Sequence, residues 1–355
     1  MFFLEILIDY IIPTIYSSFV SLVVVLFILF IFRIKDSNIR ILFFFLPLVK
    51  PFIIIAEKMD EPYHPPVSQQ VSYMGAFRLP DPTNIINTFK EFERGPVVFS
   101  NINYIVLFLI IIGIFVILIS KWITLYLFYR NLAYEDIVGR EDVPDIYAVI
   151  DNYTKKTKIK APYVSLTHRY YFSPFIIGIK KFALVLSPRL MDILSKNEKE
   201  VLIQHELSHI KRNDNLIGWS AMILRDLLFF NPFSYIAYSL IKSEQDKDSD
   251  KLLVKYTGRS VKEIAKNILN IILKMKSIST LKPSPQSAQG FQFTPHSLFS
   301  QLRLRNRINS ILKTDPDKIY SRIFPKILMC ILFVIFLVIQ IMFVIKINDF
   351  YLFLR

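Results

Sequence analysis

Two histidines and a glutamate, His205, Glu206 and His209, form an HExxH sequence in the second half of the chain. If this segment is an α-helix, the two imidazoles lie one turn apart on one face, where both can bind a single zinc ion. Glu206 then lies beside the ion and can take a proton from the water that zinc activates, which is the general-base role of a zinc peptidase. The chain has only 5 histidines among 355 residues, so a chance match is improbable and the spacing favours a metal site.

The residues before this motif predict the helix that it requires. Ser195 and Glu198 have the spacing of a capping box, which begins a helix by satisfying two backbone amides reciprocally. The helix also carries charged residues, among them Lys196, Lys199, Lys211 and Arg212, which argue against burial in lipid. We therefore expect a metal site in the cytosol, close to the membrane.

Composition separates the chain from ordinary soluble proteins. It is 53% hydrophobic, contains 32 phenylalanines and has a mean hydropathy of +0.41, which predicts a protein divided between bilayer and water. The net charge of +14 is scattered among apolar runs, with no nucleic-acid-binding module, so we expect no nucleic-acid partner. The single cysteine, Cys330, excludes an intrachain disulfide and a cysteine-rich metal site.

Four apolar runs are candidates for membrane spans. They cover residues 11–32, 41–56, 104–128 and 324–345, and three of them approach the roughly 20 residues that a hydrocarbon core requires. The run 41–56 is shorter and is interrupted by prolines, so it is either a kinked span or a re-entrant segment. Alternation of the spans across the membrane favours the span.

Basic residues indicate the orientation. They occur in the connection 33–40 and beside later runs, at Lys121, Arg130 and Arg322. The positive-inside rule then assigns residues 131–322 to the cytoplasm and both termini to the outside. The predicted organisation is a membrane region over 1–130, a cytoplasmic domain over 131–322, and a last transmembrane helix with a short tail over 323–355. The amino terminus lacks the basic start of a signal peptide, so the first run is expected to remain as an anchor.

The cytoplasmic part has mixed α and β character. An amphipathic helix is expected over 142–159, strands over 162–168 and 182–187, and a hairpin-like segment over 173–181. The strand at 182–187 is a candidate to receive an extended substrate by β-addition. The stretch 277–295, rich in serine, proline and glutamine, is expected to be a flexible linker.

A second apolar stretch follows the HExxH motif, over residues 216–241. Arg225 and Asp226 would be costly inside a spanning helix, so we expect two helices that press against the bilayer or the other spans. Asn231 caps the second of them and Pro232 begins it. A fifth transmembrane crossing is the alternative.

Several segments resemble membrane-bound gluzincin peptidases. These are IKAPYV, SPFIIGIKKFALVLS, the extended motif HELSHIKRND, FFNP and DSDKLLVKYTG, in that order. Three apolar runs before the motif and one after it, together with NRINSIL, resemble the BlaR/MecR-type antirepressor branch more than the HtpX or CAAX-protease branches. The resemblance implies an α-helical multi-pass membrane protein with a cytoplasmic α+β gluzincin-type zinc metallopeptidase domain.

The same resemblance implies a third zinc ligand, usually a glutamate, with an aspartate four residues later. The sequence allows two registers: Asp246 with Asp250, or Glu244 with Asp248. They differ by two residues, or about 200° of helix rotation, so only one pair can face the metal. Distance from the later Thr257–Gly258 favours Asp246 as ligand and Asp250 as the group that orients a histidine. Glu244 is the alternative third ligand.

Two residues of the extended motif, Arg212 and Asp214, are expected to support the zinc helix by tying it into the domain. His168, with Tyr170 and Tyr171, is either an oxyanion donor or, more simply, structural.

The leading hypothesis is a membrane-anchored zinc endopeptidase that cuts a cytosolic or membrane-proximal polypeptide. The resemblance implies signal transduction, by cleavage of a transcriptional repressor or of the protein itself. An HtpX-like quality-control protease and a non-catalytic transducer that keeps the fold are the alternatives. A channel or transporter is disfavoured because the long apolar runs contain almost no ionisable residues.

Overall fold

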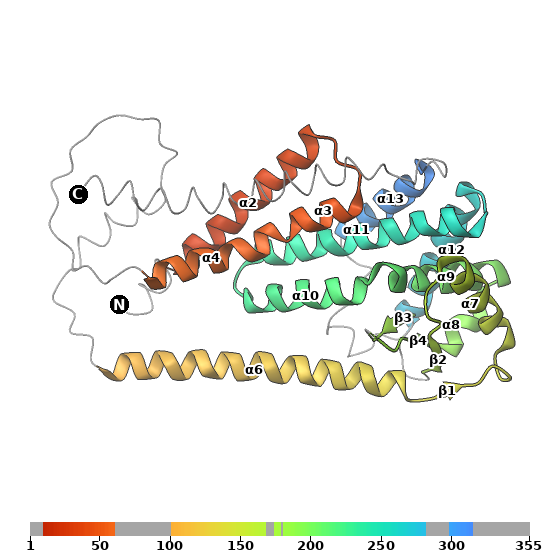
Figure 1. Ribbon diagram of the computed structural model, residues 1–355, viewed down its shortest axis with the longest axis horizontal. Helices are drawn as coiled ribbons and strands as arrows, with labels where there is room; N and C mark the ends of the chain where they lie inside the picture. Colours follow the sequence, from red (N-terminus) through yellow and green to blue (C-terminus); the bar gives the residue numbers. More distant parts are fainter. Residues whose placement is uncertain (1–9, 61–100, 168–173, 179, 282–297, 315–355) are drawn as a thin grey trace.

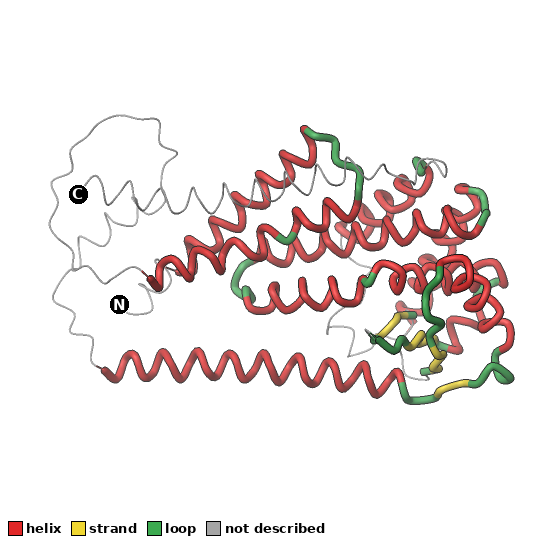
Figure 2. Tube along the Cα trace, viewed as in Figure 1, coloured by secondary structure: helices red, strands yellow, loops and turns green. Residues whose placement is uncertain are grey.

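The computed structural model describes residues 10–60, 101–167, 174–178, 180–281 and 298–314. Long helices extend along one axis of the molecule, and a small sheet with shorter helices gathers at one end (Figures 1 and 2). The predicted last span, 324–345, lies outside the described residues, as does most of the predicted linker. Its first residues continue a helix, α12 (Val261–Leu281), so the linker prediction was wrong there.

Three candidate membrane spans are present among the described residues: Ile12–Ile31, Ser37–Ile54 and Ile111–Ala133. The first is helix α2 (Ile12–Ile31), and the third is the end of α6 (Asn101–Ala133). Apolar side chains along both helices are exposed, including Phe27 and Phe30 of α2 and Val116 and Ile117 of α6. Such faces suit contact with lipid, and the three helices confirm a membrane protein.

The second candidate span consists of two consecutive helices, α3 (Ser37–Phe44) and α4 (Leu46–Asp60). Asp36 caps α3 by accepting hydrogen bonds from the amides of Asn38 and Ile39, so this span begins before the predicted residue 41. The break falls at Phe45, and Pro47 lies in the first turn of α4, where a missing amide proton costs little.

Helices α10 (Asp214–Leu227) and α11 (Pro232–Thr257) are the two helices predicted for residues 216–241; they form a hairpin, and α11 continues beyond residue 241. Asn231 caps α11 as expected, because its side chain accepts a hydrogen bond of 3.0 Å from the Phe233 amide. Its amide group also donates to Ser18 Oγ on α2, at 2.7 Å. The tip of the hairpin is thereby joined to the first span, and apolar residues of α10 and α11 share a core with α2, α3 and α4 (Figure 1).

The charges near the hairpin tip are paired with one another and with α6. Asp226 is buried and accepts hydrogen bonds from Lys121 Nζ at 3.0 Å and Trp122 Nε1 at 3.1 Å. Arg225 pairs with the other oxygen of Asp226, and its guanidinium lies 4.4 Å from the Tyr238 ring centroid. Because each charge has an opposite partner, the cost of placing these charges beside the apolar spans is offset, and the two helices pack against other spans as expected.

We expect Asn231→Ala to lower the thermal stability of the protein in detergent. The substitution leaves the partly buried Phe233 amide and the buried Ser18 hydroxyl without this partner, at a cost of about 1–3 kcal/mol. Thermal unfolding followed by circular dichroism measures the change. The matched control is Asn152→Ala on the exposed face of helix α7 (Pro144–Thr157); equal midpoints for both variants would contradict the role of Asn231.

The sheet has the strand order β1-β2-β4-β3. Its strands are β1 (Ile137–Val138), β2 (Tyr163–Leu166), β3 (Phe175–Ile177) and β4 (Ala183–Leu186). The two predicted strands are confirmed as β2 and β4, which are parallel, and β3, within the predicted hairpin-like segment, pairs antiparallel with β4. β4 has a partner on each side, so the prediction that it receives a substrate strand was wrong. Its unbroken apolar run, ALVL, is typical of an interior strand.

Several helices share one hydrophobic core with this sheet. They are α7, α8 (Pro188–Ile193), α9 (Lys196–Arg212), α12 and α13 (Leu298–Leu312). Fully buried side chains such as Ile150, Leu186 and Leu207 join the sheet to α7 and α9. Helix α9 therefore lies between the sheet and α11, with one face packed against α11.

Candidate metal centre

Helix α9 carries the HExxH motif and begins at the predicted capping box. The Ser195 side chain accepts a hydrogen bond from the Glu198 amide, and Glu198 Oε2 accepts one from the Ser195 amide at 2.8 Å. Lys274 of α12 also donates to Glu198 Oε2, at 2.6 Å. The start of α9 is thus held at three points, and further along the helix the two histidines lie one turn from each other, with ring centroids 4.9 Å apart.

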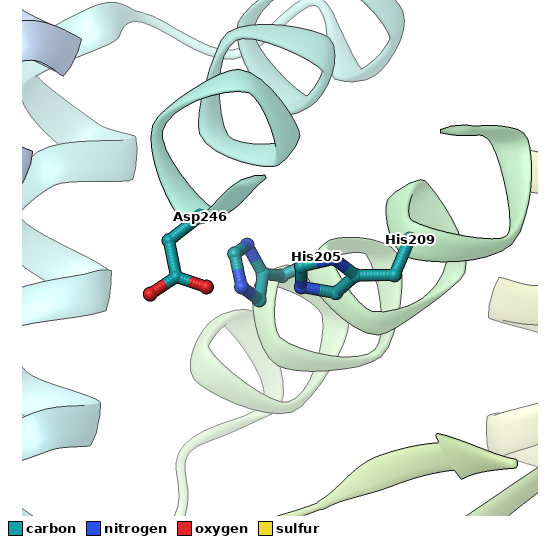
Figure 3. Close-up of side chains that lie close together, drawn as sticks. All are labelled: His205, His209 and Asp246. Atoms are coloured by element: carbon teal, nitrogen blue, oxygen red, sulfur yellow. The ribbon is translucent and has the colours of Figure 1, made fainter. Parts of the chain in front are cut away.

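Three potential metal ligands converge between α9 and α11. One atom each of His205, His209 and Asp246 lies within 4.8 Å of the other two. In Figure 3 the carboxylate of Asp246 is turned toward the histidine rings from the opposite helix. Two imidazole nitrogens and one carboxylate oxygen are a donor set that zinc accepts, with a fourth position left for water or substrate. The residues present therefore fit a zinc ion.

Glu244 and Asp248, the acidic pair of the alternative register of α11, form ion pairs with basic side chains instead of joining the group of potential metal ligands. Glu244 forms ion pairs with Arg40 of α3, at 3.1 Å, and with Lys247, at 2.8 Å. Asp248 pairs with Arg212 and Lys251. Asp246 and Asp250 occupy the opposite side of the helix and face α9, which follows from a helix rotation of about 200° per two residues.

Each histidine is held at its Nδ1 atom by an aspartate. Asp214 Oδ2 lies 2.7 Å from His209 Nδ1, and Asp250 Oδ1 lies 3.0 Å from His205 Nδ1. Burial lowers the pKa of His209, but the hydrogen bond and the charge of Asp214 outweigh it, so this pKa is raised above its ordinary value. Carboxylates in these positions fix the tautomer and the orientation of each ring, directing Nε2 toward a metal.

Asp214 reaches His209 because the chain turns sharply after α9. Asn213 has a left-handed backbone, with φ of 56°, between the end of α9 and the start of α10. Asparagine tolerates this conformation better than most residues. The turn brings the Asp214 carboxylate within hydrogen-bond distance of His209 Nδ1.

Arg212 joins the end of α9 to three other elements. Its guanidinium donates to the Gln245 carbonyl at 2.6 Å and to Asn38 Oδ1 at 3.3 Å, and it pairs with Asp248 at 3.2 Å. A further contact of 3.5 Å reaches Asp214. These contacts join α9 to α3, α10 and α11.

Glu206 lies beside the converging ligands without belonging to them. Burial raises its pKa above the ordinary value, and the charge of Asp246 acts in the same direction, while the two histidines and Arg307 oppose it. A carboxylate whose pKa is moved toward neutrality is suited to accept and return a proton.

Two features of the site were missed in the sequence. Asp214 was expected to tie down the helix, and its contact with His209 was not foreseen. Arg307 of α13 was not singled out, although it belongs to the segment NRINSIL; its guanidinium binds Asp250 and lies 3.1 Å from His205 Nε2. His168, Tyr170 and Tyr171 lie outside the described residues.

Apolar helices of spanning length, joined to an HExxH helix that faces a carboxylate on a neighbouring helix, are features of a membrane metallopeptidase. The family model described as BlaR1 peptidase M56 matches residues 14–302. The chain belongs to this peptidase family.

Individual relatives are similar over shorter regions. The methicillin resistance protein MecR1 of Staphylococcus aureus is 28% identical over 87 residues, which are 24% of this chain and 15% of that protein. The regulatory protein BlaR1 of Bacillus licheniformis is 28% identical over 119 residues, 34% of this chain and 19% of BlaR1. A protease HtpX homolog of Pyrococcus furiosus is 27% identical over 116 residues, 32% of this chain and 40% of the relative. The chain thus spans less than half of the length of each of these relatives.

Proposed function

We propose that the protein is a membrane-anchored zinc endopeptidase that hydrolyses a cytosolic or membrane-proximal polypeptide. The observation that carries this proposal is the convergence of His205, His209 and Asp246 beside Glu206. A zinc ion bound there would polarise the scissile carbonyl and activate a water molecule. Glu206 would accept the proton from that water and deliver it to the leaving amine.

We also propose the arrangement in the membrane. The basic connection 33–40 and the basic residues at the end of α6, such as Arg130, favour the same side for α3 and the sheet domain, which would be the cytoplasm. Contacts between the start of α3 and α11 support this, because Ser37 and Arg40 are held against Lys251 and Glu244. A peptide would then reach the site along β3, one of the two edge strands of the described sheet and the one that packs near α9.

The biological role that we favour is signal transduction, by cleavage of a transcriptional repressor or by self-cleavage. Similarity to a regulatory protein and to a methicillin resistance protein supports it. A quality-control protease is the second candidate, since the HtpX homolog is matched over a larger share of its own length. A transducer without catalysis is the third, and peptide hydrolysis by the purified protein would exclude it.

Metal removal tests the proposed activity. The purified protein in detergent should cleave a proteome-derived peptide library, stop when zinc is stripped by a chelator, and recover when one equivalent of zinc is restored. Mass spectrometry of new peptide termini measures the cleavage, and elemental analysis measures the metal. Cleavage that persists in protein without metal would contradict zinc catalysis.

A further inference from the structure

Helix α13 places an arginine against the metal centre from a part of the chain far beyond the HExxH motif. Arg307 is largely buried, with 15% of its side chain exposed. The helix is anchored nearby by Ile311, which is fully buried in the main core, and by Ile308, which packs against that core. The position of the Arg307 side chain is therefore set by packing that does not involve the metal ligands.

Arg307 grips one carboxylate at two points. Its Nε lies 2.6 Å from Asp250 Oδ2, and its Nη2 lies 2.8 Å from Asp250 Oδ1. Two parallel hydrogen bonds from a planar guanidinium fix the plane of a carboxylate, which a single contact does not. Asp250 is fully buried, and a buried carboxylate without an opposite charge would be costly.

The oxygen that Arg307 fixes is the one that touches a proposed ligand. Asp250 Oδ1 lies 3.0 Å from His205 Nδ1, so the contacts run from Arg307 through Asp250 to the imidazole. In the described part of the chain, Arg307 and His205 are the side chains with which Asp250 forms hydrogen bonds or ion pairs. The orientation of His205 thus depends on a carboxylate whose own orientation depends on α13.

A similar arrangement serves the second histidine. His209 contacts Asp214, and Arg212 lies 3.5 Å from the other oxygen of Asp214. Arg212 follows His209 on the same helix, however, whereas Arg307 comes from a helix about a hundred residues later. Only the His205 side of the site therefore requires α13 to be docked.

We propose that Arg307 is a positioning residue for the metal site, acting through Asp250 to hold the His205 ring in the orientation that binds metal. This inference rests on the proposed function. It makes metal affinity dependent on the docking of α13. Arg307 Nη2 also lies 3.1 Å from His205 Nε2 and 3.3 Å from His205 Nδ1, so it lies against the ring between the two nitrogens. We expect the two hydrogen bonds to Asp250 to be kept when metal binds.

Three variants test the proposal. Arg307→Met removes the charge and the two-point grip, and Arg307→Lys keeps a charge without the grip. Arg305→Met is the matched control, because it removes the same charge from the exposed face of the same helix. Zinc affinity is measured by competition with a chromophoric chelator, and ligand geometry by the visible absorption of the cobalt-substituted protein.

We expect Arg305→Met to match the wild type in both measurements. Arg307→Met should bind zinc about 10–100-fold more weakly, the range for loss of an outer-shell partner, and its cobalt bands should change. Arg307→Lys should retain more affinity than Arg307→Met, yet still show altered cobalt bands. If Arg307→Met does not fold, the zinc affinity and cobalt spectrum of Arg307→Lys still test the proposal.

The two proposals fail in different ways. Wild-type affinity and spectra in both Arg307 variants would overturn the positioning role, and so would tighter zinc binding by Arg307→Met, which would instead identify Arg307 as a cation that opposes the metal. Failure of the wild type itself to bind zinc would overturn the proposed function together with this inference. A combination with Asp250→Asn gives a further check: Arg307→Lys should add little in that background, because the path through Asp250 is already broken.

Discussion

Glu206→Gln is expected to reduce peptide hydrolysis by about 10²–10⁴-fold, the usual contribution of a general base, while one zinc ion stays bound. Glutamine has nearly the same shape as glutamate but cannot accept the proton. Glu206 lies outside the group of three potential ligands, so the metal should be unaffected. Peptide cleavage and zinc content, measured on the same preparation, test both parts of this expectation.

A second glutamate on α9 provides the control. Glu200 forms an ion pair with Arg259 away from the metal centre, and Glu200→Gln makes the same chemical change on the same helix. We expect its hydrolysis rate to equal that of the wild type. Unchanged cleavage by Glu206→Gln would defeat the catalytic assignment, and loss of zinc would show that Glu206 helps to hold the metal.

Asp246→Asn is expected to lose zinc binding by more than the roughly 10–100-fold that an outer-shell partner contributes. The reason is that the Asp246 carboxylate faces both histidines from α11 (Figure 3), and an amide is a weaker donor to zinc. Hydrolysis should fall with the zinc content. Titration with zinc under chelator competition measures the affinity.

Glu244→Gln is the matched variant, because it neutralises the other candidate ligand two residues earlier. Glu244 is engaged by Arg40 and Lys247, so we expect wild-type zinc affinity and at most a loss of stability from the broken contact between α3 and α11. The opposite outcome, with zinc lost in Glu244→Gln and kept in Asp246→Asn, would require the alternative register.

Residue spacing was sufficient to predict those features of the fold that depend on residues close together in the sequence. The capping box at Ser195, the cap at Asn231 and the strands β2 and β4 depend on neighbours in the sequence, and all were predicted correctly. The two helices α10 and α11 were also predicted, with Arg225 and Asp226 regarded as costly inside a spanning helix. Lys121, which binds the Asp226 oxygen that Arg225 does not bind, is 105 residues away, so the sequence contained no sign of this second ion pair.

The two registers of α11 show the same limit at the metal centre. Polar and apolar residues occur on both faces of this helix, so its periodicity could not decide between Asp246 and Glu244. The register of α11 depends on Arg40 and Arg212, which come from other helices. Arg40 forms an ion pair with Glu244, and Arg212 forms one with Asp248. The interior position of β4 likewise depends on which strands pair, and the prediction based on the strand alone was wrong.

The sequence by itself determined that two imidazoles lie one turn apart with a carboxylate beside them, because helix geometry repeats over four residues and a capping box marks where the helix begins. It also determined that long apolar helices accompany this motif. Only the tertiary structure decided which acidic residue of α11 faces the histidines, and which groups hold each ring. Those contacts join α3, α9, α10, α11 and α13, and the packing that selects them is a property of the whole fold rather than of any one segment.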